Sequence, residues 1–201
     1  LQVLSVAAHK LILLPVDPDC APVASTILAE ALQSIGLIGA AGDINGSTYY
    51  PTGERFLQLI TFLGCSPSIE LEPPAEQETL VADSRDGRFC HVFLESSEVL
   101  RFRSDPRTPT PRCPQCRTPL ANWVATLQAW QDDSAHDQWH CPQCSASGRI
   151  TGLGFGKTAG FGRSFIEIRG IYPSEAVPGE TLLNALKTLS GCVWNTIYIK
   201  E

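Results

Sequence analysis

Two copies of the tetrapeptide Cys-Pro-Gln-Cys, at residues 113–116 and 141–144, decide how the middle of this chain folds. Each copy is typical of a tight turn that brings two thiols to one point. Two such turns complete a tetrahedral shell of sulfurs, each about 2.3 Å from a metal ion. The sequence therefore predicts one metal ion held by four thiolates, those of Cys113, Cys116, Cys141 and Cys144.

The segment from about 112 to 148 resembles the zinc-ribbon class, and its Cys-Pro-x-Cys turns are also similar to rubredoxin knuckles, which hold iron in the same geometry. The resemblance implies Zn²⁺ as the cofactor, with iron as the alternative and two disulfides last. Arg117 and Ser145 depart from it, because the knuckles usually carry glycine at these positions. We therefore expect less regular turns here.

The spacer between the two cysteine pairs shows a helical stripe where a ribbon normally has a hairpin. The stripe consists of Leu120, Trp123, Val124, Leu127 and Trp130. We expect this helix to pack against the main sheet, with an exposed partner-binding helix as the alternative. Next to it, His136 and His140 stand four residues apart, and a polar loop is favoured over a second metal site. In the strand before the module, His91 is expected in the core or on a sheet face.

The chain on both sides of this module alternates between strand and helix patterns. Before it we expect a strand at 9–16, a helix at 22–35 that ends at Gly36, a second helix at 53–63 and a strand at 66–72. Around Asp86-Gly87 we expect a hairpin with strands at 79–82 and 88–95, followed by a strand at 99–103. After the module we expect a strand at 165–172, a helix at 179–189 and a strand at 193–199.

These patterns predict a mixed α/β fold, in which both chain ends build one sheet-based core. The core domain would comprise residues 1–111 and 149–201, and residues 112–148 would form an inserted zinc-ribbon-like module. Residues 53–71 and 179–199 share glycines at both helix ends and a strand that follows. An old duplication and ordinary helix capping both account for this echo.

Composition excludes several classes of protein. Of 201 residues, 43% are hydrophobic and 18% are charged, which argues against a disordered, collagenous or coiled-coil chain. No apolar run approaches the 18 residues that suggest a membrane span. The apolar start carries His9 and Lys10 and no basic leader, so we expect no signal peptide. Paired Cys-x-x-Cys motifs favour a reducing compartment, the cytoplasm. Four single cysteines are expected as small buried hydrophobes, namely Cys20, Cys65, Cys90 and Cys192.

Charge is unevenly distributed along the chain, although the net charge is −6. Residues 1–84 hold two basic and ten acidic side chains, whereas residues 85–169 hold eleven basic and eight acidic ones. Seven of the eleven arginines lie between residues 85 and 117. Arginine favours carboxylate and phosphate partners, so a binding surface is one interpretation. A solvated face that balances an acidic neighbour is the other, and it is favoured.

A glycine-rich stretch follows the module, with six glycines between residues 148 and 162. It repeats Gly-Phe-Gly-cation at 154–157 and 160–163, which would suit a nucleotide or nucleic-acid surface. Thr151 breaks the P-loop spacing, and a flap with its tip at 157–160 is favoured. The candidate partner or anion contacts are Arg101, Arg103, Arg107, Arg112, Lys157, Arg163, Phe155 and Phe161.

No catalytic signature occurs in the chain. The sequence therefore favours a non-catalytic cytoplasmic zinc protein that acts as an adaptor for a macromolecular partner. We expect this partner to be a protein. Nucleic-acid binding through the 101–117 segment and the 152–164 loop is an alternative, against which the pI near 5.2 argues. An enzyme with a cleft beside the 152–164 flap is another. The oligomeric state stays open.

Overall fold

The fold is built on a six-stranded antiparallel sheet with the strand order β10-β1-β8-β5-β3-β2. A computed structural model describes residues 9–44, 46–63, 69–71, 89–171 and 174–200. The strands of this sheet are β1 (His9–Pro15), β2 (Gly42–Ile44), β3 (Ser47–Pro51), β5 (His91–Ser104), β8 (Ala159–Arg169) and β10 (Trp194–Lys200). Strands from both chain ends meet at one side of the sheet, because β1 pairs with the edge strand β10 and with β8.

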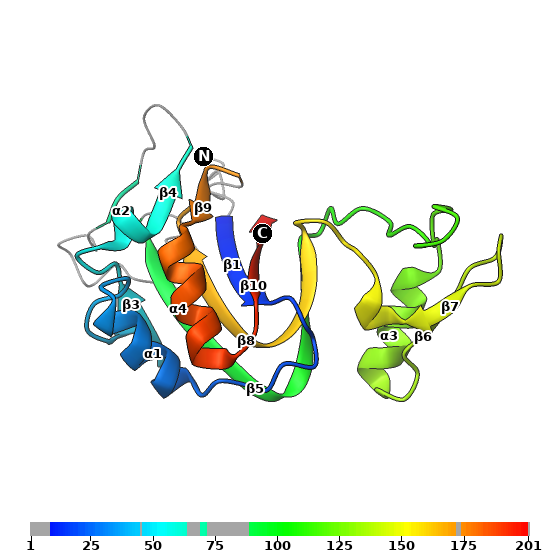
Figure 1. Cartoon of the computed structure of the whole chain (residues 1–201), viewed down its shortest axis with the longest axis horizontal. Coiled ribbons are helices and arrows are strands. Elements are labelled where there is room, and N and C mark those ends of the chain that lie inside the picture. The colour runs from blue at the N-terminus through cyan, green and yellow to red at the C-terminus, as the bar shows by residue number, and fades with distance from the viewer. Residues whose placement is uncertain (1–8, 45, 64–68, 72–88, 172–173, 201) are drawn as a thin grey trace, which may run out of the picture.

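Helices cover one face of this sheet (Figure 1). These helices are α1 (Ser25–Ser34), α2 (Phe56–Leu59) and α4 (Glu180–Ser190), whereas α3 (Trp123–Asp132) lies apart from them. Alternate residues of a strand point to the same face, so Leu11 and Leu13 of β1 pack beneath Leu32 of α1 and Leu186 of α4. The expected mixed α/β fold is confirmed. No helix among the described residues is long and apolar enough to cross a membrane.

Glycines end two helices as the sequence predicts. Gly36, after α1, has φ +77°, and Gly191, after α4, has φ +72°. The Gly191 amide donates to the carbonyl of Lys187 at 2.8 Å, which satisfies one of the last helical carbonyls. The left-handed conformation therefore fixes where each helix stops.

The predicted helix at 53–63 is wrong in extent. α2 covers only Phe56–Leu59, and the chain continues at once into β4 (Ile60–Phe62). β4 pairs with β9 (Ala176–Pro178), so a tertiary strand pairing replaces the helical turns. This unit therefore lacks a helix as long as α4, and its strand lies in a two-stranded sheet, whereas β10 lies in the six-stranded one. The structure thus gives no support to the duplication alternative. The expected hairpin around Asp86-Gly87 and most of the strand at 66–72 lie outside the described residues.

The strands expected at 88–95 and 99–103 form one strand, β5, which carries a bulge. Its register on β8 shifts between Ser96, opposite Ser164, and Arg101, opposite Gly162. Residues 97–100 of β5 thus face the single residue Arg163. Bulges of this kind bend a strand, and Figure 1 shows β5 and β8 curving together.

The segment between β5 and β8 forms a lobe beside the sheet (Figure 1). It contains α3, β6 (Gln138–His140) and β7 (Ser147–Arg149), followed by a 3-10 turn at Ile150–Gly152. β8 begins at Ala159, six residues before the expected start, and no hairpin has its tip at 157–160. The glycine-rich stretch is therefore a connector that leads from the lobe into the sheet.

Candidate metal centre

Each Cys-Pro-Gln-Cys turn lies at the end of a short antiparallel pairing. In the first, the Arg117 amide donates to the Cys113 carbonyl at 2.9 Å, and the Cys113 amide donates to the Thr118 carbonyl at 2.9 Å. The equivalent bonds of the second turn, at the tip of the β6–β7 hairpin, are 3.1 and 2.7 Å long. The two turns therefore share one hydrogen-bonding scheme, as their identical letters predict.

Arg117 and Ser145 do not make the turns irregular, contrary to expectation. Their φ angles are +65° and +58°, in the left-handed region that glycine usually supplies at this position. Both side chains are exposed and therefore meet no packing obstacle. The knuckle shape is kept, at the energetic cost of placing two L-residues in this conformation.

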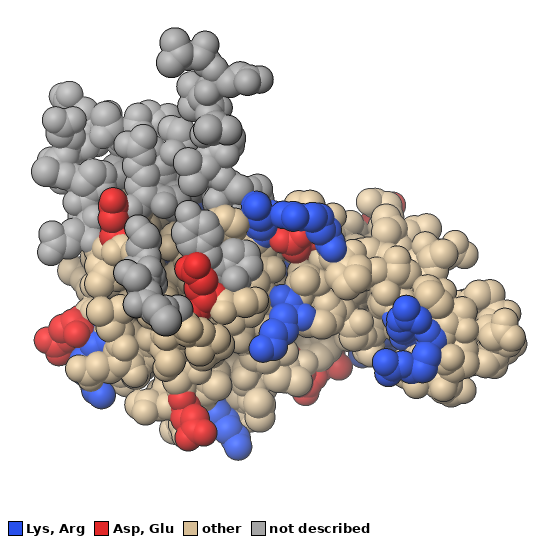
Figure 2. Space-filling view, turned by 90° about the horizontal axis from the view of Figure 1, so that it is seen from above, with Lys and Arg blue, Asp and Glu red and all other residues tan. Residues whose placement is uncertain are grey.

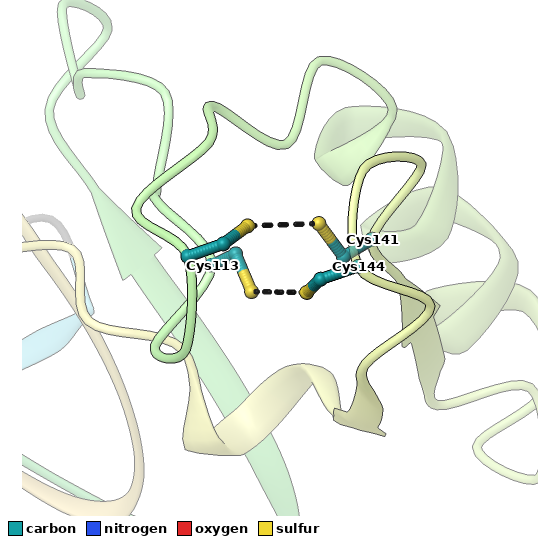
Figure 3. Close-up of side chains that lie close together, drawn as sticks. Cys113, Cys141 and Cys144 are labelled. Atoms are coloured by element: carbon teal, nitrogen blue, oxygen red, sulfur yellow. Dashed lines mark hydrogen bonds between the residues drawn. The ribbon is translucent and has the colours of Figure 1, made fainter.

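The two turns bring the four thiols together (Figure 3). The Sγ atoms of Cys113 and Cys144 are 3.7 Å apart, those of Cys116 and Cys141 are 3.5 Å apart, and all four lie within 4.8 Å of one another. In a tetrahedral shell with metal–sulfur bonds of about 2.3 Å, the sulfurs are separated by about 3.8 Å. A disulfide needs about 2.05 Å. The predicted cluster is therefore confirmed as a group that could hold a metal ion.

The cluster is partly shielded from solvent, and its thiols differ in pKa. Cys113 and Cys141 are buried, whereas Cys144 is exposed. Hydrogen bonds from the Thr118 hydroxyl and amide lower the pKa of Cys116 to about 6. The Ala146 amide favours the Cys144 thiolate, but hydrogen bonds with the other thiols and desolvation raise the pKa of Cys144 to about 12. Four neighbouring thiols cannot all ionise without a cation between them.

An apolar cluster, separate from the core between the sheet and its helices, supports this site and joins it to the sheet. Trp130 of α3 packs edge-to-face on Phe161 of β8, with ring centroids 5.1 Å apart, and Trp123 lies 5.4 Å from Phe155. Phe102 of β5 lies 4.7 Å from Phe161. The inserted helix thus packs on the end of the sheet, which is the favoured interpretation of its stripe. Phe155 and Phe161 are 4% and 5% exposed, so burial keeps these rings from stacking on bases.

The candidate cations differ in exposure and in their contacts. Arg101, Arg107, Arg112 and Lys157 are exposed. Figure 2 shows Lys and Arg in small separate groups on the face in view. Two arginines serve the fold. Arg163 donates to the carbonyls of Glu98 and Pro18 at 3.2 and 2.8 Å, and Arg112 donates to the carbonyl of Arg117 at 3.0 Å. Arg103 pairs with Glu95.

The glycine-rich connector lines a small cavity of about 160 Å³ with β1 and β10. Its described lining residues include no acid, base or nucleophilic thiol, so they offer no acid–base chemistry there. A Cβ atom at Gly160, in β8, would lie 2.8 Å from Leu14 Cδ1, whereas Cβ atoms at Gly152, Gly154 and Gly156 of the connector would meet nothing within 4 Å. The close approach to β1 thus occurs in β8 and not in the connector.

The histidines lie apart from the thiols. His136 is exposed beside Asp133, with 3.4 Å between Nδ1 and Oδ2, and His140 is exposed on β6. They share no helix face, and no second metal-binding group occurs among the described residues. His91 is fully buried, with Nδ1 2.9 Å from the Phe89 carbonyl, as expected for a core histidine.

Cys20 and Cys192 form a disulfide, which the sequence analysis missed. They are 172 residues apart and carry no motif, so only the pairing of β1 with β10 reveals that their loops adjoin. The interpretation of these two as isolated buried residues is wrong. Cys90 is buried and free, and burial raises the pKa of its thiol to about 12.

No family model, curated protein or solved structure matches this chain. The site is therefore interpreted from its own geometry.

Proposed function

We propose that this chain is a non-catalytic zinc protein in which residues 112–148 form an inserted structural module that helps to bind a protein partner. The observation that carries this proposal is the closed group of four thiols on two matching turns. Four protein ligands fill a tetrahedral shell and leave no position for water or substrate. Such a site suits a structural role.

Zinc is the metal favoured by the chemistry of the ligands. Four thiolates at tetrahedral spacing suit Zn²⁺, which needs neither an open position nor a redox change, and iron is the alternative. The lobe has only the short elements α3, β6 and β7 around its small apolar cluster. Structural zinc contributes on the order of 10 kcal/mol in such modules, so metal binding would hold the lobe folded.

A groove between the sheet and the lobe is the proposed partner site, and we call it the junction groove. It encloses about 500 Å³ between β5 and α3. Its lining includes the apolar side chains of Val99, Leu100, Phe102 and Trp130, and Val99 is 66% exposed. Arg101 adds a cation at its edge. This composition suits an acidic peptide segment that inserts one apolar side chain.

The alternatives receive less support. Nucleic-acid binding has less support because its two aromatic residues, Phe155 and Phe161, are buried in the core. Two of its arginines, Arg112 and Arg163, donate to backbone carbonyls. Absence of retention on heparin at low salt would count against it further, because phosphate binding is strongly electrostatic. The cavity beside the glycine-rich connector offers an enzyme no titratable group.

A cytoplasmic location is proposed from the four thiols, which must stay reduced to bind metal. The Cys20–Cys192 disulfide favours an oxidising compartment instead. Rapid alkylation of thiols in intact cells, followed by mass spectrometry, decides between them. Free Cys20 and Cys192 support the cytoplasm, and a complete disulfide contradicts it.

The metal proposal is tested by elemental analysis of the purified chain and of Cys144→Ser. We expect one zinc per chain, and its loss from the variant together with proteolytic cleavage inside 112–148. Cys144 is exposed, so the substitution itself disturbs no packing. Cys90→Ala, which removes a buried thiol outside the cluster, is the control and should retain zinc. Full metal content in Cys144→Ser overturns the assignment.

The partner proposal is tested with a photo-crosslinking amino acid placed at Val99 in living cells. The control position is Val193, which is 56% exposed but lies outside the junction groove. We expect a discrete adduct at position 99 alone. Its purified partner should then bind the chain and lose affinity for Arg101→Glu. Equal adducts at both positions, no adduct, or a second copy of this chain contradicts the proposal.

A further inference from the structure

A cavity with charged, hydroxyl-bearing and aromatic side chains in its lining extends from the sheet face opposite α4 to β3 and the first turn of α1. It encloses about 810 Å³, within the range of small-molecule sites. It exists because β3 pairs with β5 only at Tyr50 and Pro51 and then leaves the sheet edge. We call it the sheet cavity. Hydroxyl-bearing residues line its outer part, namely Ser25, Thr26, Ser47, Thr48 and Tyr50.

The inner part of the sheet cavity alternates carboxylates with aromatic rings. On the paired strands β5 and β8, Phe93 lies opposite Glu167, and Glu95 lies opposite Phe165. Residues two apart on a strand share a face, so all four side chains project to the same side. The two carboxylates are therefore diagonal neighbours on the cavity floor.

Both arginines of the cavity lie over these rings. The guanidinium carbon of Arg103 lies 5.5 Å from the centroid of Phe165, and that of Arg169 lies 4.2 Å from the centroid of Phe93. Arg103 is also paired with Glu95, and Arg169 with Glu167. Ring contact and ion pair together hold each guanidinium in place before a ligand arrives.

Charge is buried here at a cost to the fold. Lys10 is 6% exposed and lies directly opposite Arg169 on the sheet, although like charges in that position are destabilising. The Glu167 carboxylate offsets part of this cost, with its Oε1 atom 3.4 Å from Lys10 Nζ. A costly group of fixed charges in a cavity is typical of a binding site.

From these contacts we infer that the sheet cavity binds a small organic anion that carries hydroxyl groups, a sugar phosphate or a hydroxy acid. The planar fork of Arg103 matches a carboxylate or a phosphate. Side-chain hydroxyls of β3 and α1 would hydrogen-bond the hydroxyl groups of the ligand. The inference is independent of the zinc proposal, because none of the four thiols lines this cavity, whereas Glu95 and Arg103 also line the junction groove.

Acid–base catalysis is not part of this inference. Desolvation opposes ionisation of Glu167, yet Arg169 and Lys10 lower its pKa below the ordinary value. Glu95 is paired with Arg103. Two carboxylates engaged in ion pairs suit the binding of a ligand better than the donation of a proton.

The test is isothermal titration calorimetry of the full, metal-loaded chain with glucose 6-phosphate, gluconate, glucose and inorganic phosphate. We expect either glucose 6-phosphate or gluconate to bind at least about tenfold more tightly than glucose, since a charge-assisted hydrogen bond is worth that factor. The tighter of the two identifies phosphate or carboxylate as the anionic group. The inference is overturned if neither anion binds at 10 mM, a dissociation constant that corresponds to a binding free energy of about 3 kcal/mol. It is also overturned if glucose binds as tightly as the anions.

Variants locate the site. Arg103→Gln should weaken binding about tenfold or more, and Arg103→Lys should also weaken it, because lysine keeps the charge but loses the fork. Circular dichroism and metal content verify that both fold. Lys187→Gln, which removes an exposed cation on α4, should bind as the wild type does. Unchanged affinity in Arg103→Gln, or equal losses in Lys187→Gln, places binding elsewhere and overturns the inference.

Discussion

At the scale of single residues, the turns around the metal site depend on backbone conformation more than on residue type. Arg117 and Ser145 take the left-handed conformation although neither is glycine. With these residues in that conformation, each turn makes two backbone hydrogen bonds, and its two thiols reach the common cluster. Sequence comparison with glycine-containing knuckles therefore underestimates how well this chain forms the turn.

Ser145 offers a direct test of this conformational cost. Ser145→Gly should raise the free energy of unfolding of the module by up to about 1 kcal/mol, because glycine avoids the left-handed penalty but loses more chain entropy. Ser145→Val should lower it by about 1 kcal/mol or more. Chemical denaturation followed by tryptophan fluorescence measures both. A lower stability of the glycine variant would show that residue 145 is not left-handed.

Glu167 should make stability depend on pH. Its pKa is lowered in the folded chain, so its contribution is complete above the unfolded pKa of about 4.3 and disappears as pH falls through the folded value. Glu167→Gln should therefore lower the free energy of unfolding by about 2 kcal/mol at pH 7 and by less at pH 3. Urea denaturation at the two pH values measures the difference. A loss that is equal at both pH values contradicts this account.

At the scale of elements, the β5–β8 pair carries both the metal lobe and the sheet cavity. Beyond its bulge, β5 turns toward α3, and before the bulge it forms the floor of the sheet cavity. Arg163 stabilises this bend, since its side chain reaches the Glu98 carbonyl in the bulge and the Pro18 carbonyl beyond β1. The sequence analysis took Arg163 for a candidate partner or anion contact, because a cation next to Gly162 carries no sign of such a role.

The bend should weaken when Arg163 is truncated. Arg163→Ala should lower the free energy of unfolding by about 1 to 3 kcal/mol, because two carbonyls lose a charged donor. Arg101→Ala, which removes an exposed arginine of the same bulge region, should change it by no more than about 0.5 kcal/mol. Thermal and chemical denaturation compare the two. Equal effects would mean that Arg163 is an ordinary surface cation.

Local signals predicted some elements well and others poorly. The apolar stripe in 120–130 and the glycines after α1 and α4 are local signals, formed by residues close together in the chain. The sequence alone therefore indicates those elements. The short α2 and the single long β5 depend on strands that are distant in sequence. The cysteine cluster was predictable because each turn carries half of the site. The sheet cavity was not, since its charges come from β1, β5 and β8.

At the scale of the whole molecule, two sulfur cross-links would hold different parts of the chain. The thiol cluster lies in the lobe, whereas Cys20–Cys192 joins the loops at the ends of β1 and β10. The loop before Cys20 is also tied to the lobe, since Arg149 lies 3.3 Å from Asp19 and pairs with Asp137 at 2.7 Å. Loss of the disulfide would therefore loosen the core near the lobe but leave all four thiols in place.

Removal of either cross-link should accordingly leave the other in place. Cys20→Ala/Cys192→Ala should lower the global free energy of unfolding by about 3 to 5 kcal/mol, because a loop of this length restricts the unfolded chain strongly. Its zinc content should stay at the wild-type value. A chelator should instead expose 112–148 to protease and leave the sheet folded, as hydrogen exchange would record. Loss of zinc from the double variant, or unfolding of the sheet by the chelator, would show that the chain folds as one cooperative unit.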